Sequence, residues 1–364
     1  MSAAIWRAGA VIAACAVLTG AASCAAATAA SMATAASAQA SWQLVKQVHS
    51  GPDGGFTAIV AVGAHGGWAF DGFSAPTAWE RSGSSWTQVP FPGRAGEEVI
   101  AAGASSPSNV WAFTDGSHSR ALRWDGHAWK AQRAFPGQIG GAIVIGPADV
   151  WVFGQSYQPG GGLGAWHYNG TTWNRVRSGY GLDGGSALSA RDIWAFGGTN
   201  VAHWNGSTWT RTTVAGLLPP QRPLNFPGVR GILALSDRDV YAIGSGNAQD
   251  EGGPTVILRY NGHTWAKVAG GYYGIGTEPI QQASPDGRGG LWLPMPGVDG
   301  MPSYLVHYTS GHLAAVTLPR PATAIDIECT ARIPGSASLL AGGLTYANGH
   351  PGTNVAAVIY QYRP

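Results

Sequence analysis

Two acidic residues near the end of the chain have a spacing that suits acid and base chemistry. Asp326 and Glu328 belong to the alternating run Ile325-Asp326-Ile327-Glu328, and residues i and i+2 of a β-strand point to the same side. A carboxylate pair can hydrolyse a glycosidic bond when its surroundings separate the two pKa values. Because these acids are too close along one strand for the inverting geometry, a catalytic partner would have to come from another strand. The alternative is that both acids line a wet channel or pair with arginine.

Further carboxylates and tyrosines lie in segments that we expect to be long surface loops. Asp183 and Glu278 are the other candidate acids for catalysis. The candidate ligand-binding aromatic residues are Tyr157, Tyr180, Tyr272 and Tyr273. Aromatic rings beside carboxylates suit sugar binding, although ordinary solvated loops have the same composition.

Metal and cofactor chemistry is not predicted. After the first 40 residues the sequence contains a single cysteine, Cys329, and no metal-ligand spacing lies near it. Its position in an expected inner strand favours a buried, inert thiol over a nucleophile. We therefore expect neither a cofactor nor a metal site.

The elements that must position these residues are encoded in a repeat. A tryptophan-bearing phrase recurs about every 40 to 50 residues, which is the length of a four-stranded propeller blade. Its copies are Gly67-Trp68-Ala69-Phe70, Asn109-Val110-Trp111, Asp149-Val150-Trp151, Asp192-Ile193-Trp194, Asp239-Val240-Tyr241 and Gly290-Leu291-Trp292, with a degenerate seventh copy at Ser338-Leu339-Leu340. Segments of small and aliphatic residues precede the copies and suit innermost strands.

A second phrase follows the first and predicts a tight hairpin. It is clearest at Tyr168-Asn169-Gly170-Thr171-Thr172-Trp173 and Trp204-Asn205-Gly206-Ser207-Thr208-Trp209. Asn-Gly and Asp-Gly favour two successive positive φ angles, which predicts type I′ turns. The copy at Tyr308-Thr309-Ser310-Gly311-His312-Leu313 is the weakest match.

The two ends of the repeat region complete each other. Val355 to Tyr362 matches a third strand, whereas Ser41 to Val48 matches the fourth-strand pattern. The sequence therefore predicts an all-β, seven-bladed β-propeller over residues 41–364, closed by pairing the N-terminal strand with the last blade, so that open sheet edges are avoided.

The repeated tryptophans are expected to pack between blades, because equivalent positions recur in successive repeats and each ring buries about 150 to 250 Å². Surface tryptophan rows can also form sugar platforms, but the regular recurrence favours packing. Asp149, Asp192 and Asp239 precede these strands and are interpreted as turn residues that bind backbone N–H groups.

The hairpin phrase resembles a shortened Asp-box of sialidase-like propellers, and the whole repeat is similar to secreted bacterial kelch-type propellers. The resemblance implies the fold and no particular activity, since both groups include enzymes, lectins and scaffolds. Sialidases would imply an early aromatic-Arg-Ile-Pro motif with an arginine cluster. The one partial match to this motif is Ala331-Arg332-Ile333-Pro334, which lies in the last repeat and lacks the aromatic residue.

Composition and the N-terminal region bear on location and partners. Charged residues are 11% of the chain and the formal net charge is +2, without the basic cluster that nucleic acid or an anionic membrane would attract. Residues 1–40 read as an export signal and an Ala/Ser/Thr-rich leader, and Cys24 faintly matches a lipoprotein box. We expect a monomer, extracellular or surface-held, with a possible lipid anchor at Cys24 and no membrane span.

Three functions fit these features. The favoured one is a non-catalytic binding module for polysaccharide or protein ligands. The alternatives are a glycosidase or polysaccharide lyase that works from the long-loop face, and a protein–protein scaffold.

Overall fold

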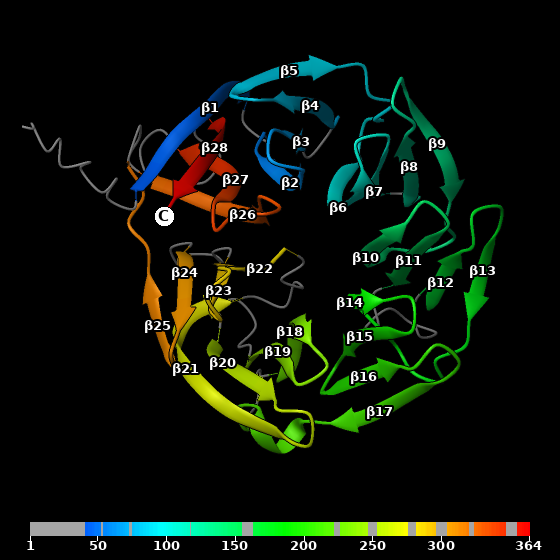
Figure 1. Cartoon of the computed structure of the whole chain (residues 1–364), viewed down its shortest axis with the longest axis vertical. Helices are drawn as coiled ribbons and strands as arrows, with labels where there is room; N and C mark the ends of the chain where they lie inside the picture. Colours follow the sequence, from blue (N-terminus) through cyan, green and yellow to red (C-terminus); the bar gives the residue numbers. More distant parts are fainter. Residues whose placement is uncertain are drawn as a thin grey trace, which may run out of the picture. The chain divides into compact units, whose positions relative to one another are not determined.

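Seven four-stranded antiparallel sheets stand around one axis (Figure 1). This computed structural model describes residues 41–51, 54–72, 75–116, 118–154, 163–221, 226–246, 253–275, 282–295, 304–319, 324–346 and 355–364. The predicted all-β propeller is therefore confirmed. Residues 1–40, for which the sequence predicts an export segment, lie outside the described residues, and Cys24 is among them.

We number the blades in the order of their innermost strands. Blade 1 contains β2 (Phe56–Val62), β3 (Gly66–Asp71), β4 (Thr77–Ser82) and β5 (Ser85–Val89). Blade 2 contains β6 (Glu98–Ser106), β7 (Asn109–Asp115), β8 (Arg120–Trp124) and β9 (Trp129–Ala134). Blade 3 contains β10 (Ile139–Gly146), β11 (Asp149–Gly154), β12 (Ala165–Tyr168) and β13 (Trp173–Val176). Blade 4 contains β14 (Gly184–Ser189), β15 (Asp192–Gly197), β16 (Asn200–Trp204) and β17 (Trp209–Thr213).

The remaining blades follow the same plan. Blade 5 contains β18 (Gly228–Ser236), β19 (Asp239–Ser245), β20 (Gly253–Tyr260) and β21 (Trp265–Ile275). Blade 6 contains β22 (Ser284–Pro285), β23 (Leu291–Met295), β24 (Tyr304–Thr309) and β25 (His312–Ala315). Blade 7 contains β26 (Ala324–Arg332), β27 (Leu339–Tyr346), β28 (Val355–Arg363) and β1 (Ser41–Gly51). The one helix in the described part is the 3₁₀ turn η1 (Ala215–Leu217), and none there is long and apolar enough to cross a membrane.

The ring closes through the two ends of the repeat region. β1 pairs antiparallel with β28, from Ser41 opposite Arg363 to Gly51 opposite Val355, and the two strands lie together in Figure 1 as the blue and red arrows. The predicted closure is confirmed. It gives blade 7 the same number of strands as its neighbours and leaves no blade with a missing outer strand.

Each inner strand begins on one face of the ring and ends on the other. We call the face where β2, β6, β10, β14, β18, β22 and β26 begin the upper face, and the face where they end the lower face. Loops that lead into inner strands, and loops that join second to third strands, therefore lie on the upper face. The short turns between first and second strands lie on the lower face.

The repeated tryptophans fill the seams between neighbouring blades, as the sequence predicts. The second-strand ring of one blade meets the fourth-strand ring of the next edge to face, with centroids 5.1 Å apart for Trp68 and Trp129 and 5.9 Å apart for Trp151 and Trp209. The pairs Trp111–Trp173, Trp194–Trp265 and Trp292–Trp42 repeat this contact. Edge-to-face aromatic pairs stabilise beyond the area that they bury.

Two seams lack the ring pair. Tyr241 packs in one cluster with Leu313 at the seam of blades 5 and 6. At the seam of blades 7 and 1, Leu340 packs in one cluster with Trp86. By register, Leu340 is the residue at the tryptophan position of blade 7, since it pairs with Ala331 as Trp68 pairs with Val60.

The aspartates before the second strands bind side chains rather than turn backbone, so that prediction is wrong. Asp149 Oδ1 accepts hydrogen bonds from Trp151 Nε1 at 3.0 Å and interacts with His167 Nε2 at 2.8 Å. Asp192 interacts with His203 at 2.9 Å and Asp239 with Arg259 at 2.6 Å. Cross-strand pairing places these third-strand groups over the second-strand ring, so the carboxylates stabilise the lower face of the seams.

The hairpin turns also differ from the predicted type I′ geometry. Gly170 and Gly206 have φ of 97° and 94°, but the asparagines before them keep negative φ. Each asparagine side chain instead accepts two backbone N–H bonds, as Asn205 does from Ser207 and Thr208, which is an Asx turn. Two successive positive φ angles occur at Ser310 and Gly311, in the copy whose sequence match is weakest.

Candidate functional site

One position near the start of the inner strands is repeated around the axis. Strand pairing skips a single residue in five inner strands, which marks a β-bulge. The skipped residues are Thr57, Ile100, Gly140, Arg230 and Glu328. Asp183 occupies the equivalent position of the inner strand in blade 4, and its backbone N–H donates a hydrogen bond to the Phe196 carbonyl. We call these six residues the bulge ring; the corresponding residue of blade 6, Gln281, lies outside the described residues.

Three carboxylates belong to inner strands on one side of this ring. Asp326 and Glu328 belong to β26 of blade 7, and Glu98 begins β6 of blade 2. The negative charges of Asp326 and Glu98 both act on Glu328. β2 of blade 1 stands between these two strands, so the charges of Glu98 and Glu328 act on each other across blade 1. The three carboxylates therefore come from two blades.

The electrostatics of this acidic group set Glu328 apart. Burial, followed by the charges of Asp326 and Glu98, raises the pKa of Glu328 well above its usual value. Burial and the same acids raise the pKa of Tyr346 to about 12, and its hydroxyl lies 3.5 Å from Asp326 Oδ2. The protonated form of Glu328 is therefore favoured more than that of an ordinary glutamate.

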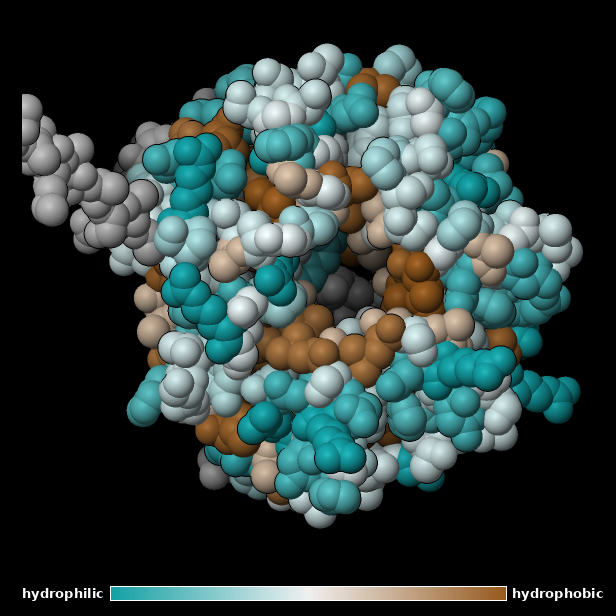
Figure 2. Space-filling view, viewed as in Figure 1, coloured by the Kyte–Doolittle hydropathy of each residue, from teal (hydrophilic) through white to brown (hydrophobic). Residues whose placement is uncertain are grey.

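Figure 2 shows that the molecule is hollowed at the axis and that apolar residues border the opening. Several inner strands carry half-buried aliphatic side chains beyond the bulge ring, toward the lower face: Val60, Val62, Ile143, Ile145, Leu233 and Leu235. The axial hollow is thus apolar along much of its wall. The acidic group lies on the wall of blades 7 and 2, near the upper face.

Gln282 spans the axial side of blade 7. Its Oε1 accepts a hydrogen bond from the Ile59 N–H of blade 1 at 3.0 Å, and its backbone carbonyl accepts one from Thr330 Oγ1 of blade 7. Because β2 is paired only with β3, this Ile59 N–H points toward the axis. The side chain is 9% exposed, and its Nε2 has no acceptor among the described residues. A buried amide donor therefore lies where blades 6, 7 and 1 are joined through Gln282, Thr330 and Ile59.

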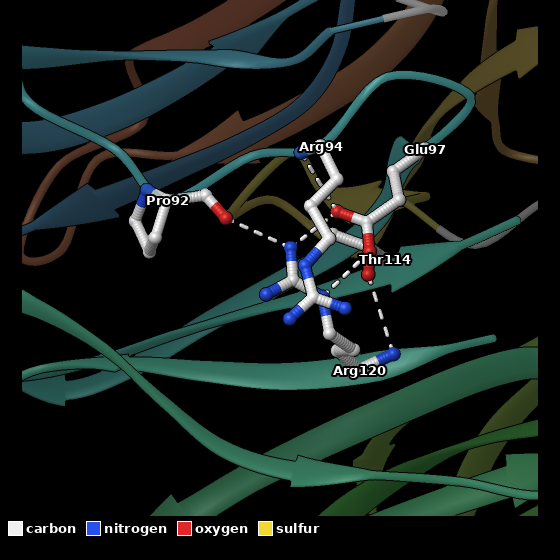
Figure 3. A network of polar contacts seen from close by, with 5 residues as sticks. All are labelled: Pro92, Arg94, Glu97, Thr114 and Arg120. Carbon is white, nitrogen blue, oxygen red and sulfur yellow. Dashed lines mark hydrogen bonds and ion pairs between the residues drawn. The ribbon is translucent and has the colours of Figure 1, made fainter.

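A second charged contact fixes the loop between blades 1 and 2 (Figure 3). Arg120 binds both carboxylate oxygens of Glu97, with Nε 2.5 Å from Oε1, and donates to the Pro92 carbonyl at 2.8 Å. Glu97 also accepts the Arg94 N–H at 3.0 Å, and Arg120 N–H bonds to Thr114 Oγ1 at 3.2 Å. Glu97 and Arg120 are 4% and 3% exposed. This buried pair holds the loop that leads to Glu98.

An open cleft of about 350 Å³ lies beside the same loop. Its lining is formed by Pro76, Thr77, Gln88, Val89, Pro90 and Phe91. The cleft belongs to the outer part of blade 1. It is lined by no titratable side chain, so none of its lining side chains can act as an acid or a base.

The predicted site residues are only partly brought together. Asp326 and Glu328 meet, whereas Asp183 stands in blade 4, across the ring, and is 8% exposed. Tyr180 is half-buried in a core cluster under the guanidinium of Arg211, 5.3 Å from its ring centre. Burial also raises its pKa, against the opposing charge of Arg211.

The other candidate residues fall elsewhere. Glu278 and Tyr157 lie outside the described residues. Tyr272 and Tyr273 are in strand β21 and not in a loop, which corrects the sequence interpretation. The aromatic and small residues there extend the fourth strand, and Tyr272 is paired with Pro254.

Sequence reasoning missed one residue of this face and the relation between two others. Glu98 precedes the bulge residue Ile100 by two positions, as Asp326 precedes Glu328, so an alignment of inner strands by their bulges would have related Glu98 to Asp326. Phe226 is 53% exposed, the most exposed large apolar side chain in the described part. Its carbonyl accepts a bond from Arg230 of the bulge ring at 2.8 Å, but no repeat pattern marks it.

The acidic group does not form a metal centre by geometry. Within the described ranges, no three His, Cys, Asp or Glu side chains lie close enough together to hold one ion.

No protein-family model matches the chain, and no curated protein matches its sequence. Solved structures share the fold. One is YCF48 bound to D1 peptide, with a TM-score of 0.56 and 10% identity over 89% of this chain and 97% of that one. The WD40 β-propeller domain of Doa1 gives 0.55 and 12% over 87% and 96%. The GH74 xyloglucanase from Xanthomonas campestris gives 0.54 and 13% over 87% and 55%.

These likenesses show the propeller fold and no shared activity. The kelch-type and Asp-box resemblance therefore stays a prediction, as does the specific function.

Proposed function

We propose that this protein is an exported, non-catalytic binding propeller that holds an extended protein segment on its upper face, over the axial hollow. The observation that supports the proposal most is the set of acidic side chains at one side of the bulge ring, Asp326 and Glu328 of blade 7 and Glu98 of blade 2, whose charges interact. Charged groups that come from separate blades give a recognition surface that no single loop provides. Phe226, exposed on the same face, adds an apolar contact of the kind that protein ligands use.

A protein ligand fits the described surface better than a polysaccharide does. Sugar platforms need exposed aromatic faces, and every tryptophan that the structure describes is buried or half-buried, most of them in the seams. YCF48 was solved with a bound peptide, which supports the idea that a propeller of this size can hold one. The export segment at residues 1–40 supports action outside the cytoplasm.

The test uses photo-cross-linking from two faces of one blade. Phe226 lies just before β18 and Asp237 just after it, so the two positions are separated by about 30 Å of strand. A photoreactive amino acid at Phe226 should capture a surface protein, whereas the same group at Asp237 should not. Equal capture from both positions, or none from Phe226, would reject the upper-face binding module.

A glycosidase is the second candidate, favoured by one observation. Burial and neighbouring acids raise the pKa of Glu328 well above its usual value, and a general acid needs a pKa raised in this direction relative to its partner. Release of soluble sugar from a polysaccharide panel, lost in Glu328→Gln with the fold intact, would establish this function. Retention of a polysaccharide without release would instead indicate a sugar-binding module.

A further inference from the structure

The seam between blades 7 and 1, where the ring closes, is held differently from most others. It lacks the edge-to-face tryptophan pair, because Leu340 stands at the tryptophan position and packs in one cluster with Trp86. The inner strand β2 contacts β26 and β27 here, and Cys329 donates its thiol to the Phe56 carbonyl at 3.3 Å. Aliphatic packing and the first residues of β2 therefore maintain this closure.

Asp71 binds the upper end of the same seam. It is the last residue of β3 and pairs with Phe56. Its carboxyl group accepts a hydrogen bond from the Gly55 N–H, while the Gly72 N–H donates to the Gly55 carbonyl at 3.2 Å. Gly55 in turn lies against blade 7, since a Cβ added to it would be 2.8 Å from Leu344 Cδ2. Asp71 therefore fixes the residue through which blade 1 contacts Leu344.

The surroundings of this carboxyl group oppose its ionisation. Asp71 is 6% exposed, and its Oδ1 has no hydrogen-bond partner in the part of the chain that the structure describes. An ionised carboxylate has room for about four hydrogen bonds, and a buried charge without compensation costs free energy. Thr77, opposite Asp71 in β4, donates its hydroxyl to the Asp71 backbone carbonyl at 3.4 Å. Burial accordingly raises the pKa of Asp71 to about 7.

No nearby charge offsets this burial among the described residues. The strands β2 and β5 carry no titratable side chain. The titratable side chains on the other strands of this region are Glu80 and Arg81 on β4, Glu98 on β6, Asp115 on β7, Asp326, Glu328, Cys329 and Arg332 on β26, Tyr346 on β27, Tyr360, Tyr362 and Arg363 on β28, and Lys46 and His49 on β1. None of them contributes to the pKa of Asp71, which reflects burial against the Gly55 hydrogen bond. Ionisation of Asp71 therefore depends on whether its carboxyl group stays buried.

We infer that Asp71 is a pH-sensitive contact in the ring closure: its neutral carboxyl group holds blade 1 against blade 7, and loss of its proton loosens the seam. The closed seam keeps a proton that the open seam loses, because opening solvates the carboxyl group. Asp71 therefore stabilises the closed seam most below about pH 4, and this stabilisation is lost as the pH rises to about 7. Above that range both forms are ionised and the effect is constant. Only the O–H bond of the carboxyl group breaks, and the proton passes to solvent.

Blade 2 provides a matched carboxylate in a different environment. Asp115 ends β7 as Asp71 ends β3. Both of its carboxylate oxygens are bonded, since Ser119 Oγ donates to Oδ1 at 2.8 Å and Gln138 Nε2 donates to Oδ2 at 3.3 Å. Its blade meets the next one through the tryptophan pair described above. Asp115 is therefore the control position for Asp71.

Thiol labelling of Cys329 tests the inference, because this thiol is fully buried at the seam. The full chain is treated with a dipyridyl disulfide, which reacts with thiols in acid and in neutral solution, and the peptide that contains Cys329 is quantified by mass spectrometry. The rate for the wild type is divided by the rate for Asp71→Asn at each pH, which removes the pH dependence of the thiol itself. Between pH 5 and pH 8 this ratio should rise roughly 100-fold, since the pKa of Asp71 is about 7 in the closed seam and near its ordinary value in the open one.

Two controls separate this contact from general effects. Asp115→Asn should follow the wild-type pH profile. Labelling should be nearly insensitive to low concentrations of urea, because opening of one seam exposes far less surface than unfolding of the chain. Circular dichroism should show that each variant keeps its fold.

Three results would each overturn the inference. They are a ratio that stays constant between pH 5 and pH 8, the same change of profile in Asp115→Asn as in Asp71→Asn, and a labelling rate that rises steeply with urea. The inference does not depend on the proposed function, which capture from Phe226 tests separately.

Discussion

Gln282 and Ile59 join blades 6 and 1 by a hydrogen bond of 3.0 Å that passes along the axial edge of blade 7. The same glutamine accepts the Thr330 hydroxyl through its backbone carbonyl. One residue therefore connects three blades at the place where the chain closes into a ring.

Replacement of Gln282 should weaken the closure. In Gln282→Ala the buried Ile59 N–H loses its acceptor, and an unsatisfied buried donor costs about 1 to 3 kcal/mol. The free energy of unfolding from urea titration should fall by this amount. Gln88→Ala, an exposed glutamine on β5, serves as the control and should change stability little. Equal effects of the two variants would show that the connection across blade 7 adds nothing.

Replacement of either Glu97 or Arg120 in the buried ion pair should lower the free energy of unfolding. Glu97→Leu leaves the guanidinium buried and unpaired, and such changes destabilise by about 3 to 5 kcal/mol. The double variant Glu97→Leu/Arg120→Leu should be more stable than either single variant, because no charge is then left without a partner. A double-mutant cycle from chemical denaturation measures this coupling.

The exposed pair of Lys130 and Asp125 provides the comparison. Lys130→Ala removes a surface contact of 2.6 Å, and exposed ion pairs contribute little to stability. If Lys130→Ala proved as destabilising as Glu97→Leu, burial could not be the reason for the strength of the Glu97–Arg120 pair.

Asp71 should make stability depend on pH. Burial raises its pKa from 3.8 to about 7, against a backbone hydrogen bond from Gly55. The folded state therefore holds a proton that the unfolded state loses, and the stabilisation present below about pH 4 is lost as the pH rises toward 7. Each pKa unit corresponds to about 1.4 kcal/mol, so the change amounts to a few kcal/mol. Urea titrations across this pH range should show that the free energy of unfolding of Asp71→Asn depends less on pH than that of the wild type.

Asp286 serves as a control, because its effect on the pH dependence of stability should have the opposite sign. Burial alone would raise its pKa, but hydrogen bonds from Arg288 N–H, His307 and Gly290 N–H outweigh burial and keep the pKa below its usual value. At pH values above the pKa that Asp286 has in the unfolded chain, its carboxylate stabilises the fold. This contribution is lost as the pH falls through the pKa that Asp286 has in the folded protein. Asp286→Asn should therefore lower stability at neutral pH, whereas Asp71→Asn should raise it. The same direction of change in both variants would contradict this assignment.

The tryptophan seams should carry much of the stability. Trp111 is fully buried and meets Trp173 of the next blade at 5.8 Å. Removal of a buried aromatic ring costs about 3 to 5 kcal/mol, so Trp111→Ala should lower the free energy of unfolding by this amount. Leu44→Ala changes an exposed residue of β1 and should have a small effect. If Trp111→Ala were as mild as Leu44→Ala, the seams would not be the main source of stability.

The sequence alone determined the seven blades, the closure by β1 and the packing role of the tryptophans, because each is a local pattern repeated at a fixed interval. Trp68 and Trp151 could be assigned to one strand position without any knowledge of their partners. The same local reasoning failed at the Asx turns of Asn169 and Asn205, where the side chain competes with the backbone for the turn N–H groups.

Only the tertiary structure decided which acids interact electrostatically with Glu328. Glu98 and Glu328 are far apart in the sequence, and their proximity depends on closure of the ring and on bulges that interrupt simple alternation in β6 and β26. The register of these strands is set by packing against neighbouring blades. A repeat pattern specifies each blade, but the site is formed by inner strands from different blades, which the pattern does not place relative to one another.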